Sequence, residues 1–105
     1  MVGDIYLAEI YFTDLSECKI RPVLILKILG DDVICLPLTT NMKASGVVIK
    51  NSDLSNGKLK KESIVVVPKN ITLHKSILRK YIATINKNLF QRIQDIFCKE
   101  IGCKE

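Results

Sequence analysis

The stretch Lys19–Leu26 reads KIRPVLIL. A continuous run of branched apolar residues predicts a buried strand, which we expect over Ile20–Leu29. Pro22 lies near the start of this strand, where a missing backbone N–H is tolerated. A proline also biases the residue before it toward extended backbone. Arg21 is therefore predicted to lie at the mouth of a buried strand, beside a polar loop.

The residues on either side of this strand predict a series of further short strands. Alternating or apolar β-rich segments are expected as strands at residues 4–12, 33–38, 46–50, 62–67 and 80–85, with a mixed segment at 71–77. Polar residues predict loops at 13–19, 39–45 and 51–61, and the last of these is expected to be a long mobile connection. Pro37 falls inside an expected strand, which predicts an edge position or a bulge.

One amphipathic helix is predicted to close the chain. Asn86 is a suitable N-cap, and Gly102 is expected to end the helix. Apolar residues recur on one helical face, namely Leu89, Phe90, Ile93, Ile96, Phe97 and Ile101. Six or seven short strands followed by one helix predict a mostly β (α+β) fold in a single domain over residues 1–105: a small, curved antiparallel barrel with the helix packed on it.

The composition narrows the function classes. The chain has 16 Lys and Arg against 11 Asp and Glu, a net charge of +5 that favours anionic partners or a lysine-rich surface. Four cysteines without C-x-x-C spacing and a single histidine argue against a zinc site. No apolar run approaches the roughly 20 residues that cross a membrane. We therefore expect a cytoplasmic protein with reduced thiols. Dinucleotide, P-loop, zinc-hydrolase and serine-hydrolase motifs are all missing from the sequence.

Two groups of polar residues are candidates for phosphate chemistry. Arg21 can offer a planar, permanently charged fork to a phosphate, or can be an ordinary exposed arginine at a strand start. Thr39, Thr40 and Asn41 follow a buried strand directly. They can form a donor cluster for phosphate oxygens or base edges, or simply a turn.

Two further candidates lie later in the chain. An imidazole can accept and donate a proton, which makes His74 a candidate for moving protons, although a lone histidine near a strand end is more often structural. It is accompanied by Lys69, Thr72 and Lys75. Residues 58–61 (KLKK) form a lysine-rich run that is either solvated surface or a source of attraction to a phosphate backbone.

The order of these segments resembles the MazF/PemK family of type II toxin–antitoxin toxins. The likeness covers almost the whole chain and rests on five segments in the right order: GDIY at 3–6, RPVLI at 21–25, LTTN at 38–41, SIVVV at 63–67 and TLHK at 72–75. The resemblance implies an SH3-like barrel, a homodimer and a sequence-selective endoribonuclease that needs no metal or other cofactor. It implies attack of the RNA 2′-hydroxyl on the adjacent phosphate.

The resemblance also implies roles for individual residues. Arg21 matches the family's catalytic arginine and Thr39 its catalytic threonine. Many relatives carry a second arginine where this chain has Ile71, and an aspartate where it has His74, which we expect to replace the missing group in part. The RNA-binding residues expected on this basis are Asp14, Ser16, Glu17, Lys19, Thr40, Asn41, Lys43, Lys69 and Thr72.

The resemblance predicts partners as well as an activity. The expected partners are single-stranded RNA or mRNA, a cognate antitoxin with an acidic or amphipathic tail, and operator DNA bound together with the antitoxin. Two alternatives stay open on the same small barrel. One is a non-enzymatic toxin similar to the gyrase poison CcdB, and the other is a nucleic-acid or protein binding module.

Overall fold

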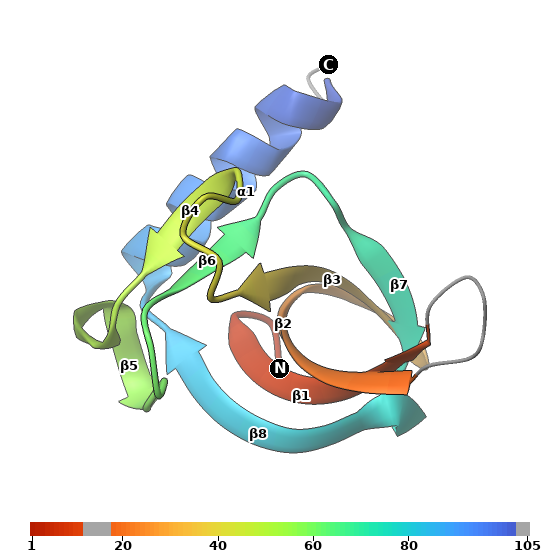
Figure 1. Cartoon of the computed structure of the whole chain (residues 1–105). Helices are drawn as coiled ribbons and strands as arrows, with labels where there is room; N and C mark the ends of the chain where they lie inside the picture. The colour runs from red at the N-terminus through yellow and green to blue at the C-terminus, as the bar shows by residue number, and fades with distance from the viewer. Residues whose placement is uncertain (12–17, 103–105) are drawn as a thin grey trace.

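The computed structural model describes residues 1–11 and 18–102. These residues form eight strands, two short 3-10 turns and one α-helix (Figure 1). The elements are β1 (Asp4–Tyr11), β2 (Cys18–Leu29), β3 (Asp32–Thr39), β4 (Gly46–Ile49), η1 (Asn51–Asp53), β5 (Leu54–Gly57), β6 (Ser63–Val66), β7 (Ile71–His74), η2 (Lys75–Ile77), β8 (Leu78–Ile85) and α1 (Lys87–Ile101). The prediction of a mostly β fold closed by one helix is confirmed.

All paired strands run antiparallel. The strand order is β4-β6-β3-β2-β1-β8-β5, and β7 pairs with β3 outside this path. Figure 1 shows that the sheet curls into a half-barrel, with α1 lying along the β4–β6 side. The β2–β3 ladder ends at Val23 and Pro37, and the candidate site lies beyond this end of the ladder.

Residues 23–26, the apolar end of the KIRPVLIL stretch, are buried on both faces of β2, whereas Lys19, Ile20 and Arg21 before them are exposed. Leu24 and Leu26 enter the main core, which is shared with Leu89 and Ile93 of α1. The alternate residues Val23 and Ile25 enter a second, smaller cluster that is covered by β7. Since successive side chains of a strand point to opposite faces, an uninterrupted apolar run is what a strand with two buried faces needs.

The helix begins and ends as the sequence predicts, but its apolar face is not buried throughout. The Asn86 side chain accepts a hydrogen bond from Leu89 N at 2.7 Å, and Gly102 ends the helix in the left-handed conformation, with φ of 69°. Ile101 is nevertheless 49% exposed. The last turn projects beyond the sheet (Figure 1), so the amphipathic pattern runs longer than the surface it covers.

Two local predictions are wrong. The polar segment 51–61 is not a plain connection, because it contains η1 and β5, and β5 pairs with β8. Pro37 lies on a central strand instead of an edge strand. It does occupy a gap in the pairing, since β7 pairs with β3 up to Cys35 and β6 pairs with it only from Leu38. The missing N–H of the proline is tolerated in that gap.

Two cysteines differ in state. Cys35 is a free thiol with no exposed surface, and it packs in the second, smaller core cluster. Burial raises the pKa of this thiol to about 12, so it stays protonated and unreactive at neutral pH. Cys98 is disulfide-bonded, and the expectation of reduced thiols is therefore wrong for this residue.

Candidate active site

Arg21 and Thr39 come together because of the register between β2 and β3. The ladder pairs Ile25 with Cys35 and Val23 with Pro37. Continued by two residues along each strand, the same register places Arg21 opposite Thr39. Both residues also lie on the same face of the sheet, since each is an even number of positions from a paired residue on that face.

A cavity of about 320 Å³ opens where the two strands separate. Its lining contains both residues, in a set made up of Ile10, Arg21, Pro37, Leu38, Thr39, Val66 and Ile71. We refer to it as the Arg21 cavity. The remaining lining is apolar, which lowers the local dielectric and strengthens any charge interaction made there.

The two polar groups of this cavity are available to a ligand. Arg21 is exposed, and among the residues that the structure describes its guanidinium has no ion pair or hydrogen bond. Asn41 N donates a hydrogen bond to Thr39 Oγ1 at 3.1 Å. The threonine oxygen is thus used as an acceptor, and its own O–H remains free to donate. A fixed cation and an oriented hydroxyl form a suitable pair of donors for a phosphate.

Asn41 shapes this end of β3. Its side-chain Oδ1 accepts from Lys43 N at 3.0 Å, and its carbonyl accepts from Ala44 N at 3.0 Å. The alternatives left open for Thr39–Asn41 are therefore not exclusive. The segment is a turn, and the turn also orients the Thr39 hydroxyl.

The structure does not bring His74 to the Arg21 cavity. His74 pairs with Asp32, at the opposite end of β3 from Thr39. Seven residues of extended strand separate Asp32 from Thr39, which is roughly 23 Å along the chain. His74 instead caps η2: its Nδ1 accepts from Ser76 N at 3.1 Å and contacts Ser76 Oγ at 2.9 Å. Ile71, by contrast, lines the cavity.

The remaining predicted RNA-binding residues are spread around this region. Asp14, Ser16 and Glu17 lie outside the described residues. Lys19 is exposed two residues before Arg21, and Lys43 and Lys69 are also exposed. Thr72 is exposed and alternates with Ile71 along β7, so it faces away from the cavity. The described lining of the Arg21 cavity contains no carboxylate or imidazole.

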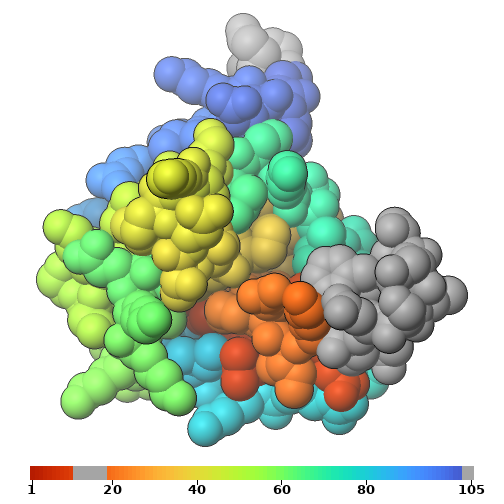
Figure 2. Space-filling model, in the orientation of Figure 1, coloured from red at the N-terminus to blue at the C-terminus, as the bar shows by residue number. Residues whose placement is uncertain are grey.

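A second cavity, of about 550 Å³, lies on the other face of the same strands. Its lining is Leu7, Pro22, Thr40, Lys58, Leu59, Lys60, Lys61, Ser63, Lys80, Tyr81 and Ile82. We refer to it as the lysine cavity. Figure 2 shows this hollow between the green segment around residue 60, the orange start of β2 and the light-blue β8. Lys80 was not predicted as a site residue, because only the pairing of β8 with β1 and β5 brings it there.

In residues 1–11 and 18–102, no three His, Cys, Asp or Glu side chains gather into a group that could hold a metal ion. The same part of the chain contains no helix long and apolar enough to cross a membrane.

The chain resembles known toxins in both sequence and fold. Residues 1–101 match the family described as "PemK-like, MazF-like toxin of type II toxin-antitoxin system". One similar structure is an endoribonuclease in complex with its cognate antitoxin from a mycobacterial species. It is 20% identical, with 97% of this chain and 92% of that chain covered and a TM-score of 0.71. Another is the Mycobacterium tuberculosis toxin MazF-mt6. It is 22% identical, with coverage of 94% and 96% and a TM-score of 0.73.

A comparison with curated protein sequences gives no match. The solved structures confirm the barrel fold that the resemblance implied. The family match extends over nearly the whole sequence, including the strands that carry Arg21 and Thr39. The chain therefore belongs to the PemK-like, MazF-like toxins of type II toxin–antitoxin systems.

Proposed function

We propose that this toxin is a metal-independent endoribonuclease that cuts single-stranded RNA in the cytoplasm and so arrests growth. The observation that carries the proposal is the convergence of Arg21 and Thr39 on one cavity. Family membership supplies the reaction class, and the net charge of +5 suits a polyanionic substrate.

The proposed reaction is an internal transfer on the RNA backbone. The ribose 2′-oxygen loses its proton to a base and bonds to the adjacent phosphorus, while the bond from phosphorus to the 5′-oxygen breaks. The 5′-oxygen takes up a proton as it leaves. The products carry a 2′,3′-cyclic phosphate and a 5′-hydroxyl.

Each of the two cavity residues has a defined role in this proposal. Arg21 stabilises the negative charge that develops on the phosphoryl oxygens, and Thr39 donates a hydrogen bond to one of them. Arg21 has no neutralising carboxylate among the described residues, so its charge is available to the phosphate. The described lining of the cavity offers no general base at neutral pH.

We also propose that the toxin forms a homodimer and is inhibited by an antitoxin. The similar mycobacterial endoribonuclease is bound to its cognate antitoxin. A segment rich in acidic residues could cover the basic surface and compete with RNA. Binding of operator DNA would then be a property of the toxin–antitoxin complex.

Induction of the gene in growing cells tests the proposal. Wild type should arrest growth, and its RNA fragments should end in 2′,3′-cyclic phosphates, whereas Arg21→Ala should do neither. Growth arrest with intact RNA would contradict the proposal and favour a non-enzymatic toxin. Neither arrest nor cleavage by wild type would favour a simple binding module.

A further inference from the structure

The lysines of the 58–61 segment are held in place by the fold. Asn51 brackets Leu59: its Nδ2 donates to Leu59 O at 3.1 Å, and Leu59 N donates to its Oδ1 at 2.8 Å. The Leu59 side chain is only 9% exposed and packs in the main core. Two residues further on, Lys61 O accepts from Ser63 Oγ at 3.2 Å. The lysine run is therefore anchored along its backbone, unlike a loose solvated loop.

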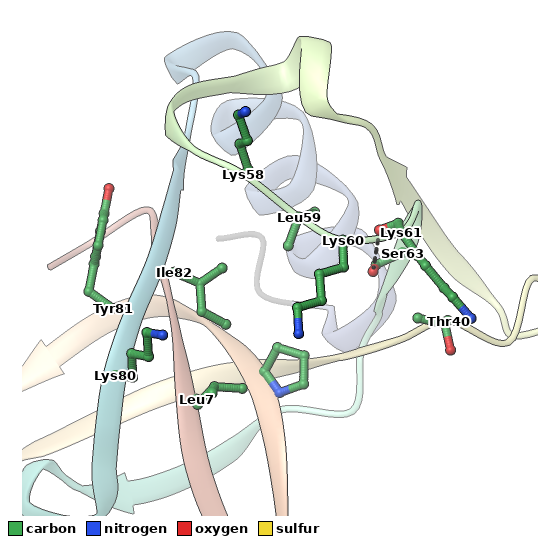
Figure 3. Close-up of a pocket in the computed structure, with 11 residues that line it drawn as sticks. Leu7, Thr40, Lys58, Leu59, Lys60, Lys61, Ser63, Lys80, Tyr81 and Ile82 are labelled. Carbon is green, nitrogen blue, oxygen red and sulfur yellow. Dashed lines mark hydrogen bonds between the residues drawn. The ribbon is translucent and has the colours of Figure 1, made fainter.

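Two lysines from separate parts of the chain face the same space. Figure 3 shows the side chains of Lys60 and Lys80 directed into the lysine cavity, whose lining also includes Leu7 and Ile82. Lys61 extends toward Thr40, and Lys58 points away from the centre. The described lining contains four lysines and no carboxylate. Bringing like charges together is unfavourable, and a polyanion bound between them removes that cost.

The lysine cavity and the Arg21 cavity are lined by neighbouring residues of the same two strands. Arg21 lines one cavity and Pro22 the other, and Thr39 and Thr40 are divided in the same way. Because successive residues of a strand point to opposite faces, the two cavities lie on opposite faces of β2 and β3. A chain of phosphates that has one member at Arg21 would have to pass the end of the β2–β3 ladder to reach Lys60 and Lys80.

We propose that the lysine cavity is a second RNA subsite, which holds a phosphate of a nucleotide flanking the cleavage site. The proposal rests on the ribonuclease function proposed above. Lys60 and Lys80 are its principal phosphate ligands, and Lys61 with Thr40 marks the entrance from the Arg21 cavity. The apolar floor formed by Leu7, Leu59 and Ile82 receives the sugar or base.

An acidic peptide is the alternative occupant, and RNA fits the observations better. Phosphates recur at every nucleotide, so a substrate cut at Arg21 necessarily carries further phosphates close by. An acidic peptide bound in the lysine cavity, in contrast, need not contact Arg21 and Thr39 at all. Lysines also act as point charges that contact phosphates without strict geometry, which suits contacts outside the reacting centre.

The test compares two double variants with equal loss of charge. Lys60→Ala/Lys80→Ala removes the proposed ligands, and Lys27→Ala/Lys99→Ala removes two exposed lysines that line neither cavity. KM and kcat are measured on RNA oligonucleotides that extend on both sides of the mapped cut, and on versions shortened from either end. Binding of labelled RNA is measured by anisotropy at several salt concentrations in an Arg21→Ala background.

The proposal predicts that Lys60→Ala/Lys80→Ala raises KM about tenfold with kcat within about twofold, and lowers the slope of log affinity against log salt by about 1.4. Shortening the RNA from one end should abolish the difference from wild type. The proposed subsite would be overturned if Lys60→Ala/Lys80→Ala had the same KM and salt slope as the control variant. It would also be overturned if the increase in KM were equal on every shortened RNA. Polyglutamate serves as the acidic-peptide probe. If Lys60→Ala/Lys80→Ala lost polyglutamate binding and kept RNA binding, the cavity would belong to a protein partner, and the proposed RNA subsite would be overturned.

If the wild-type toxin does not cut RNA, the proposed function fails. The RNA-binding measurement by anisotropy then tests the subsite by itself. A reduced salt slope in Lys60→Ala/Lys80→Ala still supports an RNA subsite, and a slope equal to that of the control contradicts it.

Discussion

Arg21 on β2 and Thr39 on β3 occupy facing positions of one antiparallel register, two residues beyond the last pair of their ladder. Past Val23 and Pro37 the strands separate, and β3 continues with β6 as its partner. The pair therefore retains the alignment of a sheet while the space between its members is open to a ligand. A rigid scaffold with an open end is a favourable place for oriented donors.

Thr39 is predicted to act through its hydroxyl alone. Thr39→Val keeps the shape and removes the O–H, and we expect kcat to fall by about 10². Thr39→Ser should retain activity within about tenfold, because it keeps the donor. Single-turnover cleavage of a labelled RNA measures both variants. Equal activity of Thr39→Val and wild type would remove Thr39 from the reaction.

The family resemblance implies a second arginine at the position of Ile71. Ile71 lines the Arg21 cavity, so an arginine there would place a second cation near the same phosphate. We expect Ile71→Arg to raise kcat/KM about tenfold. Ile71→Gln is the control for size without charge, and it should give no gain. A slower Ile71→Arg enzyme with an unchanged thermal midpoint would show that the cavity has no use for a second cation.

His74 is expected to matter for stability and not for cleavage. His74→Ala removes the acceptor for Ser76 N and should lower the free energy of unfolding by about 1 kcal/mol. His74→Asn should restore most of this loss, because asparagine is a good capping residue. Both variants should cleave RNA at the wild-type rate. A decrease in kcat for His74→Asn without a loss of stability would restore the catalytic role expected from the sequence.

Gly57 allows β5 to approach β8 beside the lysine cavity. Its φ is +79°, and a Cβ there would lie 2.2 Å from the carbonyl oxygen of Ile82. Gly57→Ala should therefore cost more than about 2 kcal/mol in urea unfolding. Gly30 is the matched control, since its φ is +64° and no atom lies within 4 Å of the added Cβ. Gly30→Ala should cost only the backbone term, about 1 kcal/mol.

The sequence predicted those features that depend on neighbouring residues. The Asn86 cap, the Gly102 stop and the apolar strand 20–29 all follow from local preferences, and all are present. β5 was missed because LSNG has no strand signal, and its pairing with β8 depends on contacts distant in sequence. The remaining features depend on strand pairing between distant segments: no local pattern places Arg21 opposite Thr39, brings Lys60 and Lys80 to one cavity, or puts His74 at the far end of β3.

The toxin is proposed to cleave RNA at the Arg21 cavity without a metal ion. Purified toxin is incubated with RNA in EDTA, and product ends and rates are compared among wild type, Arg21→Ala and Arg92→Ala, which changes an exposed arginine of α1. We predict 2′,3′-cyclic phosphate ends from wild type and Arg92→Ala, and a rate at least about 10² lower for Arg21→Ala. Intact RNA at high wild-type concentration, or equal cleavage by Arg21→Ala, would contradict the account.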